Sequence, residues 1–175
     1  MEAVESGLFP SRSGWISRLV EVLQPASTRA DQLGSLELFS GLPYSDLEFA
    51  AGLIRETLVE RGTRMTVQGR PAPRLWLILE GEALVSADAR PIRVAARGDL
   101  VGLVSMLRAV ESPETAIAIS TIRAFEADLD GFSRLMVRRP IRRRLVLASA
   151  AVTAWPSRPQ PRGRRSPATN ISPGS

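Results

Sequence analysis

The chain contains neither cysteine nor histidine, and these two absences exclude whole classes of functional site. Without cysteine there are no disulfides, which favours a cytoplasmic setting. Without histidine there is no Ser-His or Cys-His nucleophile pair and no His-ligated zinc, copper or iron centre. No suitably spaced pair of carboxylates stands out in their place. We therefore predict that the protein is not an enzyme and that it holds no metal ion.

Lysine is absent too, so all 23 basic residues are arginine. Their distribution is uneven: residues 1–130 carry a net charge of −5, whereas residues 131–175 hold ten arginines and no acid. Such asymmetry indicates a body with a basic appendage. No apolar run reaches the roughly 18 residues of a transmembrane span. The acidic N-terminus lacks the apolar stretch of a secretory signal.

The spacing of apolar residues predicts the organisation of the chain. We expect residues 1–35 to form an N-terminal extension, with a short amphipathic helix over 13–25 and a polar link over 26–34. From residue 57 onward, short runs broken by glycine or proline predict antiparallel strands, as in "RLWLILEGEALV". There the leucines at 75, 77 and 79 face one way, and Trp76 and Ile78 face the other.

The predicted fold is mainly β with flanking helices (α+β). It is an antiparallel β-barrel or jelly roll of about eight strands, as is common for short strands at even spacing. Helices precede the barrel, and a hinge helix and a long helix follow it, which gives one domain over residues 36–155. The tail, residues 156–175, holds five prolines and four arginines and lacks the apolar area to fold.

Several motifs in this order resemble the cyclic nucleotide-binding domain of the catabolite activator family and of kinase regulatory subunits. The resemblance covers residues 36–155. It rests on Phe39 and Leu42 before a helix, glycines at 62 and 69, the hairpin "LWLILEGEALV", and "RGDLVG". It implies the barrel described above, standing alone, and a phosphate-binding cassette that begins at Gly98.

The resemblance also shows where this sequence departs from the family. In the family the cassette reads Phe-Gly-Glu and later Pro-Arg-x-Ala, where the Glu binds the ribose 2′-hydroxyl and the Arg binds the cyclic phosphate. Here Leu103 stands at the Glu position and Glu114 at the Arg position. We therefore predict a degenerate pocket that does not bind cyclic AMP in the standard way. Its candidate residues are Gly98, Asp99, Gly102, Leu103, Val104, Ser105, Glu114, Thr115 and Ala116.

Two interpretations stay open for each part of this cassette. The glycines either present backbone amides to a ligand or only turn the chain. The apolar residues Leu103, Val104, Met106 and Leu107 either line a ligand pocket or fill it with their own side chains. Glu114 either binds a cation or a basic partner, or is a solvated loop acid.

The C-terminal region has two candidate contact surfaces. An apolar stripe at a/d spacing either forms a homodimer seam or packs back on the barrel: Ile141, Leu145, Ala148, Val152 and Trp155. A cluster of arginines either binds nucleic acid, acidic lipid or an acidic protein, or is solvated: Arg138, Arg139, Arg142, Arg143 and Arg144. No recognition helix follows residue 155, so we expect no sequence-specific DNA binding.

We predict from these features a non-catalytic regulatory or interaction module that acts through a partner protein. One alternative is a sensor that binds a cyclic nucleotide or another small ligand in a non-standard pocket. A second is a nonspecific polyanion binder that uses the arginine-rich C-terminus.

Overall fold

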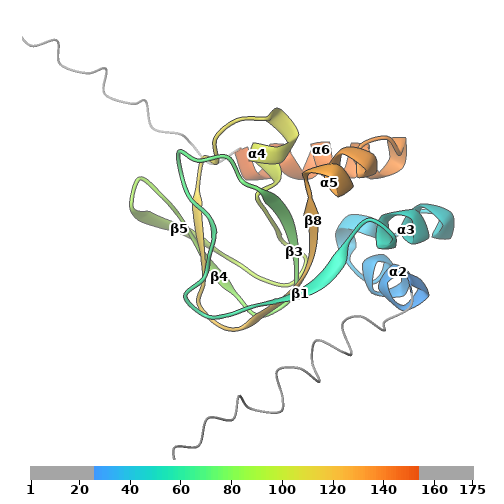
Figure 1. The fold of residues 1–175 in the computed structure, drawn as a ribbon, viewed down its shortest axis with the longest axis horizontal. Coiled ribbons are helices and arrows are strands. Elements are labelled where there is room, and N and C mark those ends of the chain that lie inside the picture. Colours follow the sequence, from blue (N-terminus) through green and yellow to red (C-terminus); the bar gives the residue numbers. More distant parts are fainter. Residues whose placement is uncertain (1–25, 154–175) are drawn as a thin grey trace, which may run out of the picture.

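The computed structural model describes residues 26–153 of the chain, with eight strands and flanking helices (Figure 1). The predicted helix over 13–25 and the tail lie outside these residues. The helices are α2 (Ala26–Gly34), the 3-10 helix η1 (Glu37–Phe39), α3 (Tyr44–Ala51), α4 (Leu103–Arg108), α5 (Leu129–Leu135) and α6 (Arg139–Thr153). The strands are β1 (Arg55–Val59), β2 (Arg64–Thr66), β3 (Arg74–Glu80), β4 (Ala83–Ala87), β5 (Arg90–Ala95), β6 (Leu100–Val101), β7 (Thr115–Ala118) and β8 (Ile122–Asp128).

The strands form two four-stranded sheets, in the orders β1-β8-β3-β6 and β2-β7-β4-β5. All pairings within them are antiparallel. The helices lie on the side of β3 and β8, away from β4 and β5 (Figure 1). The predicted mainly β fold with about eight antiparallel strands is therefore confirmed.

The first sheet separates two apolar clusters, as the alternation in β3 predicts. Leu75, Leu77 and Leu79 face the helices, together with Phe125 of β8. We call this cluster the helix-side core. Trp76 and Ile78 point the other way and pack with side chains of both sheets, which form the inter-sheet core.

The prediction of a polar link over 26–34 is wrong, because these residues form helix α2. Ala30 and Leu33 are buried in the helix-side core, and α2 packs against α3. A short helix with few apolar residues gains its stability from such packing and not from its own sequence, which is why the pattern gave little signal. The packed body therefore starts on the N-terminal side of residue 36.

The predicted hinge and long helix correspond to α5 and α6. Asp128 caps α5 by accepting a hydrogen bond from the Gly131 amide at 2.8 Å. Of the predicted seam, Ile141 and Leu145 are buried in the helix-side core of the same chain, and Ala148 packs against it. The side chains of Val152 and Trp155 lie outside the described part. None of the helices in residues 26–153 is long and apolar enough to cross a membrane.

Candidate functional site

The cassette predicted from sequence enters helix α4 through Gly102, which has a φ of 88°. A Cβ at this position would lie 2.4 Å from the carbonyl oxygen of Arg74 in β3. That distance is too short for any side chain, so glycine is required here by the close approach of two backbone segments. This favours the interpretation in which the glycine turns the chain.

The backbone amides at the start of the cassette are used inside the fold. The Gly98 amide donates to the Ile78 carbonyl at 2.8 Å, and the Asp99 amide donates to the Ala96 carbonyl at 2.9 Å. The Asp99 carboxylate in turn accepts from the Ala96 amide at 2.8 Å. The amides of Gly98 and Asp99 are therefore hydrogen-bonded to carbonyls of the protein itself and are not free to bind a ligand.

Helix α4 turns its apolar side chains toward the helix-side core. Leu103 and Met106 are buried there, Leu107 packs against the same cluster, and Val104 is half-buried. Ser105 accepts a hydrogen bond from the Ala72 amide at 2.9 Å and donates one to the Val110 carbonyl. Because α4 also contacts α6, the cassette is joined to the C-terminal helix by apolar packing. This supports the interpretation in which the leucines fill space.

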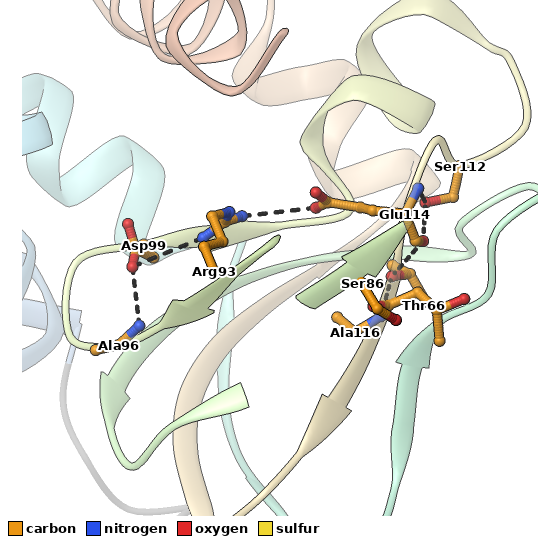
Figure 2. Close-up of polar contacts among 9 residues, drawn as sticks. Thr66, Ser86, Arg93, Ala96, Asp99, Ser112, Glu114 and Ala116 are labelled. Carbon is orange, nitrogen blue, oxygen red and sulfur yellow. Dashed lines mark hydrogen bonds and ion pairs between the residues drawn. The ribbon is translucent and has the colours of Figure 1, made fainter. Parts of the chain in front are cut away.

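Glu114 is not a solvated loop acid, as one interpretation had it, because the residue is only 7% exposed. Its carbonyl oxygen accepts hydrogen bonds from the hydroxyls of Thr66 (3.1 Å) and Ser112 (2.8 Å), which fix the backbone before β7 (Figure 2). Next along the chain, Thr115 Oγ1 accepts from the Gln68 amide and the Ala116 amide donates to Thr66. The cassette's last three residues are thus held by strand β2 and its loop.

The Glu114 carboxylate faces Arg93 of β5 (Figure 2). The Arg93 Nη2–Glu114 Oε1 distance is 3.6 Å, and Arg93 Nη1 lies 3.8 Å from Asp99 Oδ2. Both are ion-pair distances beyond the range of a hydrogen bond. One guanidinium therefore stands between two carboxylates, one at each end of the cassette.

Strand register explains why these groups meet. Val85 of β4 lies opposite Arg93 of β5 and opposite Ala116 of β7. Directly opposed residues share a face of the sheet, and Val85 and Ala116 are fully buried. Arg93 therefore points between the two sheets, and so does Glu114, two residues before Ala116.

Sequence analysis missed Arg93, although a signal was present. In β5 the arginine alternates with Val94, which is 48% exposed, and it shares its face with buried Ala95. A charged residue on the inward face, beside an apolar residue on the outward face, reverses the usual pattern of a strand. Such a reversal marks a charged group inside the barrel.

The site holds two carboxyl groups beside one guanidinium. Burial raises the pKa of the Glu114 carboxyl, and the Arg93 guanidinium lowers it by a smaller amount. A phosphate about 4 Å from a carboxylate is repelled by about 4 kcal/mol at an effective dielectric constant near 20. Arg93 faces both carboxylates at ion-pair distance, and its buried Nη2 forms no hydrogen bond within the described residues.

The five arginines of the basic cluster have different surroundings in the structure. Arg138 pairs with Asp46 at 3.5 Å and lies 4.5 Å from the centre of the Phe49 ring, and Arg144 Nη2 donates to the Ser40 carbonyl at 2.9 Å. Within the described residues the other three arginines of the cluster form no salt bridge and are exposed: Arg139, Arg142 and Arg143.

The fold and the cassette together define a class of domain. Residues 56–139 match the family model of the cyclic nucleotide-binding domain. The resemblance to this family that was found in the sequence is therefore confirmed over these residues.

The chain is similar to one curated protein and to several solved structures. The chain is 32% identical, over 112 residues, to the acetyltransferase Pat of Mycolicibacterium smegmatis; the match covers 62% of this chain and 34% of that protein. A solved structure of a cAMP-binding acyltransferase from Mycobacterium smegmatis superposes with a TM-score of 0.54 at 30% identity, covering 70% of this chain and 39% of that one. The regulatory domain of Toxoplasma gondii PKA with cAMP gives a TM-score of 0.63 at 17% identity, covering 73% and 50%, which shows the fold alone.

The prediction that the protein is not an enzyme is wrong, because the curated relative is an acetyltransferase. The absence of histidine and cysteine excludes only the mechanisms that need these residues. The chain spans about a third of that relative's length, so its composition says nothing about the rest of such an enzyme.

Proposed function

We propose that this chain is a regulatory domain in which the arginine–phosphate contact of the cyclic nucleotide-binding family is replaced by an ion pair within the protein. One observation carries the proposal: buried Glu114 faces Arg93 at 3.6 Å, at the position where the resemblance places the phosphate-binding arginine. In this proposal the domain does not bind cyclic AMP in the standard way, and its signal comes through a partner.

Leu103 supports the same proposal. The residue stands where the resemblance places the ribose-binding glutamate, and it is 2% exposed in the helix-side core. A glutamate there would bury a carboxylate among apolar side chains, which costs several kcal/mol. The ribose contact therefore cannot be restored at this position without destabilising the domain.

Similarity to an acetyltransferase suggests the output of the domain. We extend the proposal to the control of acetyltransferase activity, within a longer chain or in a complex, on the strength of the 32% identity to Pat. The match covers 34% of that relative, so the rest of an acetyltransferase of that kind has no counterpart in the matched residues.

Titration with cyclic AMP tests the proposal directly. Ligand at about 100 times its dissociation constant raises the free energy of unfolding by about 2.7 kcal/mol, which a thermal melt detects. We expect no saturable shift for the wild-type chain. The double variant Arg93→Gln/Glu114→Arg places a guanidinium at residue 114, where the family has its phosphate-binding arginine, and removes the neighbouring guanidinium of Arg93. We expect this variant to gain a saturable shift of its melting temperature with cyclic AMP. Glu114→Gln is the matched control, since it removes the negative charge without adding a positive one.

A saturable shift of the wild-type chain at micromolar cyclic AMP would contradict the proposal. If Arg93→Gln abolished that shift, the nucleotide would be bound through Arg93, which is the alternative of a sensor with a non-standard pocket.

A further inference from the structure

A groove of about 590 Å³ runs beside the first half of α6. Leu42, from the loop between η1 and α3, forms one side of it. The other side consists of residues of α6: Arg139, Pro140, Arg143, Arg144 and Leu147. The volume is comparable to that of ligand-binding sites, which measure about 300–1,000 Å³. No acidic residue lines this groove in the described part of the chain.

The arginines of the groove lack compensation within the protein. Arg144 is held by the Ser40 carbonyl, but Arg139 and Arg143 are exposed and form no salt bridge within residues 26–153. The first turn of α6 contains no acid. Positive charge near the start of a helix costs about 0.3–1 kcal/mol per residue, because the helix dipole has its positive end there. Contacts within the described residues therefore do not explain why Arg139 and Arg143 stand at the start of α6.

Apolar side chains alternate with the charges in the same groove. Leu147 is 59% exposed although it is a leucine on a helix that buries Ile141 and Leu145. Leu42 approaches it from the preceding loop, and Pro140 lies exposed between the arginines. The groove thus offers an aliphatic surface flanked by guanidinium groups.

We propose that this groove binds an acidic segment of a partner protein that carries aliphatic side chains between its carboxylates. Arg139 and Arg143 bind the carboxylates, for which the planar guanidinium is suited to two parallel hydrogen bonds. Leu42 and Leu147 bury the aliphatic side chains. A nucleic acid satisfies the arginines through its phosphates but has no aliphatic side chain for the two leucines, so the lining favours a protein segment.

This inference goes beyond the proposed function, because it concerns a surface that does not include the cassette. It holds whether or not a nucleotide binds at Glu114. Helix α4 of the cassette nevertheless contacts helix α6, which forms one side of the groove.

Fluorescence anisotropy with the full chain tests the inference, using three labelled probes of equal charge. These are a peptide of glutamates interrupted by leucines, a leucine-free polyglutamate and an oligothymidylate. We expect the leucine-containing peptide to bind most tightly. The double variant Arg139→Glu/Arg143→Glu should weaken its binding about tenfold, since each exposed ion pair contributes up to about fivefold. Leu147→Ser should remove the preference for leucine.

Arg90→Glu/Arg108→Glu is the matched control, because both arginines are exposed and lie outside the groove. It makes the same change in net charge, and the arginines of the tail contribute equally to every variant. The substituted side chains are exposed, so melting temperatures should stay near the wild-type value. The inference is overturned if the groove variant binds the leucine-containing peptide like the control, or if the leucine-free probes bind the wild-type chain as tightly.

Discussion

Substitution of Leu145 by alanine distinguishes a core residue from a dimer seam. Leu145 is 1% exposed and packs with Ile141 and Leu103 in the helix-side core of one chain. Removing a buried leucine side chain to alanine costs about 2–5 kcal/mol, from the lost transfer free energy and the cavity left behind. For a domain of this size, about 3 kcal/mol lowers the melting temperature by about 10 °C.

The assay is thermal unfolding followed by circular dichroism, at low and at high protein concentration, with sedimentation of the same samples. Leu147→Ala is the matched control on the same helix, since Leu147 is 59% exposed and its truncation should change the stability by less than about 0.5 kcal/mol. We expect a loss for Leu145→Ala that is independent of concentration. The reasoning is refuted if Leu145→Ala melts like the wild type but converts a dimer to a monomer.

Three further outcomes follow from the structure. Burial raises the pKa of the Glu114 carboxyl, so the folded state binds this proton more tightly than the unfolded state. The stability of the wild type relative to Glu114→Gln should therefore fall as pH rises from the ordinary pKa of 4.5 through the raised pKa. Denaturant unfolding of both proteins at a series of pH values measures this difference. An unchanged difference would argue against burial of the charge. Gly102→Ala should lower the melting temperature much more than Gly98→Ala, because both glycines have positive φ but only at Gly102 would the Cβ meet a backbone oxygen. Asp128→Ala should cost about 1 kcal/mol through loss of the helix cap, with no change in peptide binding by the groove.

Part of this site was accessible from the sequence because its signals are local. The alternation of Leu75, Trp76 and Leu77 follows from the two-residue period of a strand, and the structure places these side chains in two different cores as predicted. The order of the glycine motifs likewise predicted the barrel and the position of the cassette. The sequence also identified Leu103 and Glu114 as departures from the family pattern, since Leu103 follows Gly102 where the family has Phe-Gly-Glu and Glu114 follows Pro113 where it has Pro-Arg-x-Ala.

The environment of those residues was decided only by the tertiary structure. Arg93 lies on strand β5, and Glu114 directly precedes strand β7; these two strands do not pair with each other. Both side chains reach the barrel interior through the register that β5 and β7 each keep with β4. The helical spacing of Ile141 and Leu145 predicted an apolar face but not which surface covers it. The packing of η1, α4 and α6 decides that this apolar face is covered by the helix-side core of the same chain. The same packing leaves Leu147 beside Arg143 in an open groove. Strand pairing and helix packing bring together residues that are far apart in the chain. A local sequence pattern does not determine which distant segment a residue will contact.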